Sequence, residues 1–277
     1  MARALRIVLC TRGGLQGALV LDRLMAIPRA QVCGMVLSTR TDGPKSGFVE
    51  GAISRIRRSG FAYAAYLWLS TGGAELALRI SGPAPVALRA RRAGIVLRAT
   101  RCVNDADSLA FVRSCAPDLL VSAFFDQHIG DELSGTPALG AVNIHPSPLP
   151  RDRGVDPVFF AMLRGERNLG VTLHRIVPAW DAGPILATES VHREADESVL
   201  RATARLYDRG GVLLGRHLDA LAAGDPGAAQ GDEGCYDSWP TREQVAALRG
   251  KGLSLAHASD LWWRPIPDDK MELEPNR

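Results

Sequence analysis

The stretch LRIVLCTRGGLQGALVLDRLMAIPRAQVCGMVL, residues 5–37, indicates the fold class. Its first part, residues 5–10, is a short and mostly apolar run that predicts a strand, and Thr11-Arg12-Gly13-Gly14 ends it. Apolar residues at helical spacing follow from Leu15 to Ile27, and residues 31–37 predict a second strand. A strand, a loop, a helix and a strand in this order are typical of a parallel sheet with crossover helices.

The rest of the chain continues this alternation. Further strands are predicted at 94–97, 117–122, 140–143, 170–176 and 185–191, and helices at 105–115, 156–164 and 196–223. Alanine-rich helical stretches, such as 49–58 and 73–79, lie between the second and third strands. We therefore expect an α/β fold with a Rossmann-like parallel sheet and flanking helices. It has a helical insertion at about 41–92, a main domain at 1–224 and a short C-terminal appendage at 225–277.

Composition excludes several classes of protein. With 277 residues, 46% hydrophobic and 23% charged, the chain is neither disordered nor a coiled coil. Gly13, Gly14 and Gly17 lack the spacing of the dinucleotide fingerprint, which argues against NAD binding. The apolar runs are too short for a signal peptide or a membrane helix, so we expect a soluble cytoplasmic protein without a membrane partner.

The basic residues and the cysteines bear on partners and metals. Only three of the 33 basic residues are lysines, and the densest arginine runs, at 55–58 and 89–92, contain no aromatic residues. We interpret these runs as solvated helix faces, which argues against nucleic acid as a partner. The five cysteines are odd in number and contain no C-x-x-C pair, so we expect reduced, mostly buried thiols and no metal site.

Unusual chemistry is concentrated in NIHPSPLPRDRG, residues 143–154, directly after a predicted strand. Asn143 and His145 lie on one side of a continuing strand, at the edge of the sheet where ligands bind. A second polar loop, 178–184, presents Asp181 beside a glycine. Alone, a histidine is more often structural, and Asp181 is equally well a turn residue. Together, an amide, an imidazole and a carboxylate form a set suited to acyl transfer.

The runs NIHPSPLPRDRGVDP, GVTLHRI and WDAGPIL resemble the folate-dependent formyltransferase family, which includes glycinamide ribonucleotide, methionyl-tRNA and sugar-amine formyltransferases. The resemblance covers about half the chain, and residues 94–125 resemble the family more weakly. It implies transfer of a formyl group from 10-formyltetrahydrofolate to an amine, without a metal. Asn143, His145 and Asp181 match the family's catalytic residues, which stabilise a tetrahedral intermediate.

The resemblance also implies binding residues. The formyl donor is expected in a cleft that contains Phe125, Gln127, Ile129, Pro178 and Trp180. Arg151 and Arg153 follow the catalytic strand and are expected to hold an anionic group of the acceptor. Asp152 departs from the family's pattern, and we expect this departure to leave the catalytic residues untouched. We interpret His174 as a core or edge-strand histidine and leave it out of the site.

The acceptor stays open among several classes. The appendage at 225–277 is shorter than the β-barrel of about 100 residues in tRNA-directed relatives, so we expect a small amine: an amino sugar, an amino acid or a specialised metabolite. Alternatives are a formyltetrahydrofolate hydrolase, a methionyl-tRNA-type enzyme without a full barrel and a catalytically silent folate-binding protein. A homodimer is also left open. Residues 235–240, with Trp262 and Trp263, are either an aromatic clamp on the substrate or a docked tail.

Overall fold

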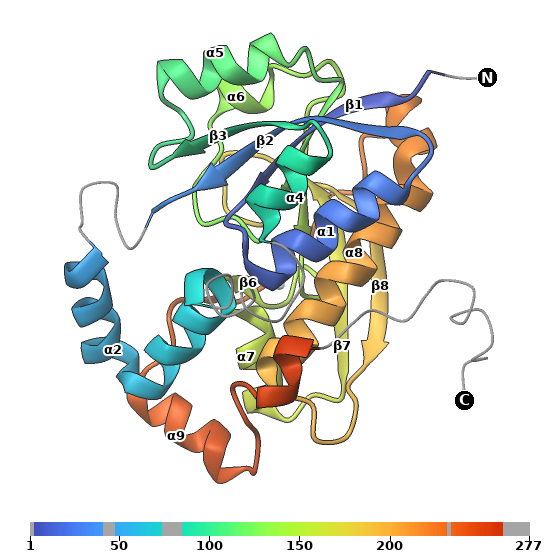
Figure 1. The fold of residues 1–277 in the computed structure, drawn as a ribbon. Coiled ribbons are helices and arrows are strands. Elements are labelled where there is room, and N and C mark those ends of the chain that lie inside the picture. The colour runs from blue at the N-terminus through green and yellow to red at the C-terminus, as the bar shows by residue number, and fades with distance from the viewer. Residues whose placement is uncertain (1–2, 41–47, 74–84, 232–233, 263–277) are drawn as a thin grey trace.

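A twisted sheet forms the centre of the protein (Figure 1). The computed structural model describes residues 3–40, 48–73, 85–231 and 234–262. Within these residues, one sheet contains seven strands in the order β3-β2-β1-β4-β5-β7-β8. Their bounds are β1 Leu5–Thr11, β2 Ala30–Ser38, β3 Val96–Thr100, β4 Leu119–Ala123, β5 Ala141–His145, β7 Asn168–Arg175 and β8 Ile185–His192.

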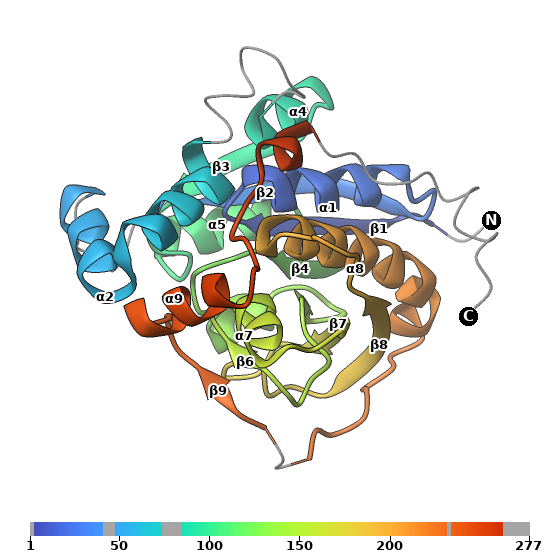
Figure 2. The same cartoon turned by 90° about the horizontal axis from the view of Figure 1, so that it is seen from below.

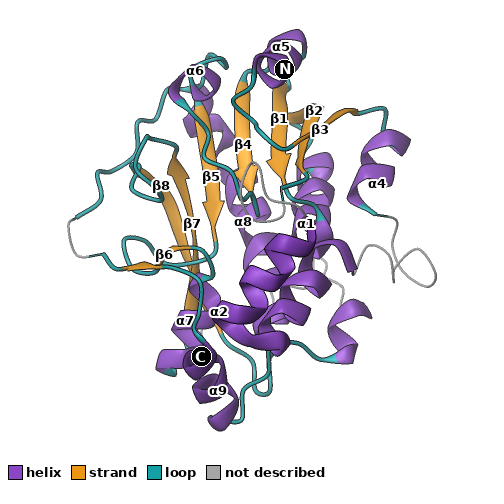
Figure 3. Ribbon diagram, turned by 90° about the vertical axis from the view of Figure 1, so that its left-hand side faces the viewer, coloured by secondary structure: helices purple, strands orange, loops and turns teal. Residues whose placement is uncertain are grey.

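Helices cover both faces of this sheet (Figure 3). The long helix α8 packs beside α1 and against β5, β7 and β8, whereas α5 packs against β3. The helices are α1 Gly14–Ala26, α2 Phe48–Trp68, α4 Val86–Arg92, α5 Ala106–Ser114, α6 Asp131–Ser134, α7 Pro157–Arg164, α8 Val199–Ala222 and α9 Arg242–Gly250, with short turns η1 Leu69–Gly73 and η2 Ala258–Trp262.

Strand β1 shows why this sheet has two apolar faces. Its side chains alternate, so that Ile7 and Leu9 join the larger cluster with α1 and α8, and Val8 and Cys10 join the smaller cluster on the other face. All four side chains are fully buried. A strand covered on both faces appears in the sequence as a continuous apolar run, which is how it could be predicted.

The α/β fold is confirmed, and one feature of the sheet differs from the prediction. Strands β1 to β5 are parallel, but β7 runs antiparallel to both β5 and β8. The loop between β7 and β8, residues 176–184, is too short for the crossover that two parallel strands need. The helical insertion after β2 is confirmed by α2 and α4, and the stretch 73–79 lies almost wholly outside the described residues.

The segment after residue 224 returns to the body of the protein (Figure 2). Its short strand β9, Tyr236–Asp237, pairs in parallel with β6, Arg153–Gly154. Helix α9 then packs against α2 and α7. The division into a main domain and an appendage at residue 224 stays a prediction. Both β9 and α9, which follow this residue, contact elements that precede it in the chain.

Both arginine runs make contacts within the protein. The guanidinium of Arg55 lies over the ring of Trp239 at 3.4 Å, and Arg58 donates a hydrogen bond to Ser238. Arg89 forms an ion pair with Asp22. The other arginines of the runs, Arg57, Arg91 and Arg92, are exposed. The interpretation as solvated faces is therefore wrong for Arg55 and Arg89, because neighbouring segments cover the faces on which they lie.

The cysteines are less buried than predicted. All five are free thiols, and Cys10 and Cys115 are buried, but Cys102 and Cys235 are exposed. Both exposed cysteines lie in loops at the protein surface, outside the buried strands and helices. In the part of the chain that the structure describes, we find no helix with the length and apolar character needed to cross a bilayer.

Candidate functional site

A cavity of about 330 Å³ opens where β1, β4 and β5 end. Segments far apart in the sequence line it: the loops after β1 and β4, the end of β5, helix α2, the start of α7, the loop after β7 and the C-terminal segment around β9. Its size lies at the lower end of the range for small-molecule sites. The lining includes Arg12, Tyr63, Tyr66, Phe124, Phe125, Asn143, His145, Asp156, His174, Trp180, Asp181, Tyr207, Tyr236 and Trp239.

Asn143, His145 and Asp181 all line this cavity. Asn143 and His145 lie on the same side of β5, with one residue between them. Asp181 lies in the loop after β7, where its backbone has a left-handed φ of 51°. One of its carboxylate oxygens lies 3.5 Å from Nδ1 of His145, and the other accepts a hydrogen bond of 3.1 Å from the backbone amide of Gly154. The structure therefore brings the three predicted side chains to one place.

Both ring nitrogens of His145 face oxygen atoms. Its Nε2 lies 2.9 Å from the carbonyl of Asp152, and its Nδ1 faces Asp181. Because a carbonyl and a carboxylate only accept hydrogen bonds, the imidazolium form satisfies both contacts. The turn after the proline-rich run brings the backbone carbonyl of Asp152 to His145, a contact that any residue type could make, so the expected effect of the Asp152 side chain stays a prediction.

His174 belongs to the site, contrary to its interpretation as a core or edge-strand residue. It is 3% exposed, lines the cavity and lies opposite Asn143 in the β5–β7 pairing. Its Nδ1 donates to the carbonyl of Arg175 at 2.8 Å, so its Nε2 accepts from the amide of Asn143 at 3.1 Å. Burial, together with the charge of His145, lowers the pKa of His174 below its ordinary value. A neutral His174 thus fixes which way the Asn143 amide turns.

The residues expected to bind the formyl donor are placed in different ways. Phe125, Gln127, Ile129 and Trp180 line the cavity, and Pro178 does not. The carbonyl of Pro178 accepts a hydrogen bond of 2.9 Å from His128. The ring of His128 meets that of Trp180 edge to face, with 5.2 Å between centroids. Pro178 therefore supports the wall that Trp180 forms.

The side chain of Gln127 has a structural role. Its amide nitrogen donates to Ser38 at 2.8 Å, and its amide oxygen accepts from the backbone of Val103 at 2.7 Å. These bonds tie the loop after β4 to the ends of β2 and β3. Because both the oxygen and the nitrogen of the side-chain amide are hydrogen-bonded within the protein, Gln127 holds the loop in place. A ligand would contact other atoms of this residue.

Neither Arg151 nor Arg153 lines the cavity. Arg151 forms an exposed ion pair with Glu166 at 3.5 Å, and Arg153 donates to the side chain of Gln230 at 2.8 Å. Arg153, in β6, therefore faces the C-terminal segment, whereas Arg151 faces the segment after α7. The arginine that does line the cavity is Arg12, which forms an ion pair with Asp126 at 2.9 Å.

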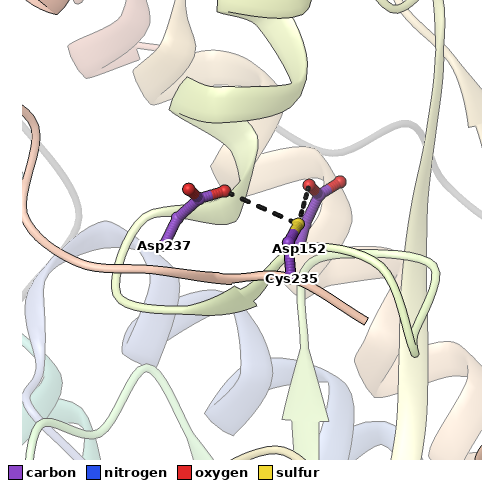
Figure 4. A group of neighbouring side chains, drawn as sticks. All are labelled: Asp152, Cys235 and Asp237. Carbon is purple, nitrogen blue, oxygen red and sulfur yellow. Dashed lines mark hydrogen bonds between the residues drawn. The ribbon is translucent and has the colours of Figure 1, made fainter. Parts of the chain in front are cut away.

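A second cluster of polar side chains lies behind β6 (Figure 4). The thiol of Cys235 lies 3.9 Å from carboxylate oxygens of both Asp152 and Asp237. Arg164 forms ion pairs with the same two carboxylates. Its guanidinium therefore already supplies the positive charge that a metal ion would bring. We interpret the cluster as a structural clasp between β6 and β9.

The aromatic residues after β9 contribute to the cavity. Tyr236 and Trp239 both line it, and Trp239 is half-buried against the main core. The side chains of Trp262 and Trp263 lie outside the described residues. Of the two interpretations of this segment, the structure supports a wall of the site for residues 236 and 239.

Comparison with known proteins identifies similar sequences. Residues 70–218 match the family model described as Formyl transferase. A methionyl-tRNA formyltransferase from Thermotoga sp. is 31% identical over 143 residues, which cover 52% of this chain and 46% of that protein. The chain thus spans about half the length of the curated relatives it matches.

Solved structures agree on the fold. A sugar N-formyltransferase from a Shewanella species superposes with a TM-score of 0.54 at 18% identity, over 84% of this chain and 76% of that one. Glycinamide ribonucleotide transformylase 1 from Symbiobacterium toebii gives a TM-score of 0.55 at 17% identity, over 84% of this chain and 96% of that one.

Proposed function

Because the chain belongs to the formyl transferase family, we propose that it transfers a formyl group from 10-formyltetrahydrofolate to the amine of a small molecule. The acceptor is an amino sugar, an amino acid or a specialised metabolite. The observation that carries the proposal is the convergence of Asn143, His145 and Asp181 on one cavity, with 3.5 Å between the last two. These groups match the needs of acyl transfer, which are a hydrogen-bond donor, an imidazole and a carboxylate.

Asn143 supplies a donor for the formyl oxygen. Its amide nitrogen carries two hydrogens, and one of them is given to His174. The second is therefore free to meet the oxygen on which negative charge develops as the amine attacks. One such preorganised donor lowers the barrier by a few kcal/mol, or about 10²-fold to 10³-fold in rate.

His145 and Asp181 handle charge and protons. The Nδ1 of His145 is 3.5 Å from Asp181, which is long for a hydrogen bond, so its N–H remains available to an oxyanion that enters the cavity. The positive imidazolium stabilises that oxyanion. The carboxylate of Asp181 lies beside His145 and accepts the proton that the attacking amine must lose.

The donor end of the cavity suits a flat heterocycle. Phe125, Ile129 and Trp180 offer an apolar slot. When bound, 10-formyltetrahydrofolate supplies the activated formyl group. Phe125, Ile129 and Trp180 would hold it, and His128 supports the position of Trp180.

An acceptor assay with the whole chain tests this function. The protein is incubated with 10-formyltetrahydrofolate and a panel of amines, and products are analysed for the mass gain of one formyl group. We expect formylation of at least one small amine, and its loss in Asp181→Asn. Formate release without any amine would instead favour a hydrolase.

Aminoacylated initiator tRNA forms a separate arm of the assay, because the curated relatives that match are methionyl-tRNA formyltransferases. Formylation of the tRNA alone would contradict a small-molecule acceptor. The cavity volume of about 330 Å³, with Tyr63 of α2 and Trp239 in its lining, supports the small amine.

A further inference from the structure

Five aromatic rings from separate parts of the chain line the cavity, and we call them the aromatic wall: Tyr63, Tyr66, Tyr207, Tyr236 and Trp239. The first two come from the helical insertion, the third from α8 and the last two from the C-terminal segment. The rings of Tyr63 and Tyr66 lie 5.5 Å apart, and both residues are buried. This wall offers an apolar surface with the electron-rich faces that attract cations, and Arg55 already occupies one face of Trp239.

The carboxylate of Asp156 lies at Tyr63 and Tyr66 of the aromatic wall. Tyr207 and Tyr236 lie closer to the charge of Asp181. Asp156 lines the cavity and is 7% exposed. One oxygen accepts a hydrogen bond of 2.8 Å from the hydroxyl of Tyr63, and the other a long one of 3.4 Å from the amide of Phe159. Among the described residues, no ion pair with a basic side chain accompanies these bonds. The lining arginine, Arg12, is paired with Asp126.

Helix capping does not explain this charge. Asp156 is the N-cap of α7, but asparagine caps a helix equally well without a charge. Burial among aromatic rings penalises the ionised carboxylate and raises the pKa of Asp156 to about 6. A buried carboxylate is favourable only when a partner compensates its charge. The missing partner is then a group that enters the cavity.

We propose that Asp156 and the aromatic wall form the acceptor subsite, which takes an amine whose apolar or ring-shaped body carries a second, positively charged group. The inference rests on the proposed function for the identity of the acceptor. The second cation pairs with Asp156 and lies against the ring faces, while the reacting amine extends toward Asn143 and His145. Anionic acceptors are rejected, because a carboxylate or phosphate at this place meets Asp156 in an apolar environment.

Three benzylamines that differ at one position test the subsite. They are 1,4-bis(aminomethyl)benzene with a second cation, 4-methylbenzylamine with a neutral group and 4-(aminomethyl)benzoate with an anion. Binding to the full chain is measured by calorimetry at pH 7.5, and formyl transfer is measured separately as kcat/KM. We expect the dication to bind at least tenfold more tightly than the neutral probe, and the anion to bind most weakly.

The substitution Asp156→Asn removes the charge and keeps both the helix cap and an acceptor for Tyr63. It should level the three affinities to within about twofold. The matched control is Asp105→Asn, the same change at the N-cap of α5 and outside the cavity, which should preserve the ranking. Equal binding of the three probes by the native protein, no binding of any, or an unchanged ranking in Asp156→Asn would overturn the subsite.

The two readouts separate this inference from the proposed function. If the ranking appears in calorimetry but no amine is formylated, the subsite stands and the proposed function fails. If amines are formylated without any preference for the second cation, the function stands and the subsite fails.

Discussion

The two ends of the cavity are built in different ways. At the catalytic end, Asn143 and His145 come from β5 and His174 comes from β7, its hydrogen-bonded neighbour in the sheet. At the acceptor end, Tyr63 comes from the helical insertion and Trp239 from the C-terminal segment. Sheet register therefore positions the first group, and packing between segments distant in the chain positions the second.

The match to the family follows this division only in part. Residues 70–218 include β5, β7 and the loop of Asp181, and also Asp156 and Tyr207, but leave out Tyr63, Tyr236 and Trp239. We therefore expect the two ends to be separable in function, with the insertion and the C-terminal segment adding acceptor choice to the chemistry of the sheet. Changes at the catalytic end should alter rate, and changes at the acceptor end should alter which amine is used.

The largest effect is expected for His145→Ala at the catalytic end. Loss of the imidazolium removes oxyanion stabilisation and the partner of Asp181, so kcat should fall about 10³-fold. Affinity for 10-formyltetrahydrofolate should stay within threefold, because the apolar donor slot is intact. Single-turnover formylation and equilibrium binding measure the two effects. The control is His192→Ala on exposed β8, and near-native turnover of His145→Ala would contradict the roles assigned here.

The second prediction concerns stability at the acceptor end. Folding raises the pKa of Asp156 from an ordinary aspartate value to about 6, so the folded protein holds the proton more tightly than the unfolded chain. The ionised carboxylate therefore destabilises the fold above pH 6, and this cost disappears as pH falls below about 4. The facing phenols, Tyr63 and Tyr66, stay neutral over this range because burial raises the pKa of each.

Asp156→Asn should thus stabilise the free protein at pH 8 by an amount on the order of 3 kcal/mol, and by almost nothing at pH 4. Urea unfolding at the two pH values measures the difference. Equal effects at both would show that the carboxylate carries no such cost. If Asp156 serves binding, Asp156→Asn should make the protein more stable and at the same time weaken its binding of the dication.

The third prediction concerns His174, which positions Asn143. His174→Leu removes the acceptor that holds the Asn143 amide, so kcat should fall about tenfold to thirtyfold with little change in either KM. His174→Gln offers an oxygen acceptor on a chain of similar reach and should recover part of the loss. Equal rates for the two variants would contradict a positioning role and favour simple packing.

The smallest effect is expected where the two distant segments of the acceptor end touch. Arg55→Gln removes the guanidinium over Trp239 and keeps part of the aliphatic stem, which should cost about 0.5–1 kcal/mol of stability. We expect faster proteolysis of the 235–240 segment and a modestly higher KM for the acceptor, with kcat unchanged. A fall in kcat in Arg55→Gln would instead show that the catalytic end depends on the acceptor end, and would contradict their separation.

Local patterns were sufficient to predict most of the sheet and part of the site. The strand before Asn143 and the proline-rich run after it could be recognised because their signals lie within a dozen consecutive residues. The same holds for the apolar run of β1 and the amphipathic pattern of α8. Such features depend on neighbours in the chain, which periodicity reports directly.

Features that depend on tertiary contacts could not be predicted. His174 joins the site only through the antiparallel register of β7 on β5, which no local pattern encodes. Gln127 and Arg153 have polar side chains that suggest ligand contacts, yet Ser38 and Gln230 bind them within the protein. Asp156 could have been noted as a helix cap, but its burial beside Tyr63 requires the insertion to be in place.

The pairing of β6 with β9 sets an order of events during synthesis of the chain. Gly154 donates its amide to Asp181, and a methyl group at this position would collide with the carbonyl of Asp237. Strand β9 leaves the ribosome only after β7, β8 and α8 have been made. The donor and the acceptor of the hydrogen bond between Gly154 and Asp181 are thus both made before the strand that packs onto Gly154, so the close approach at this glycine is the later of the two contacts to form.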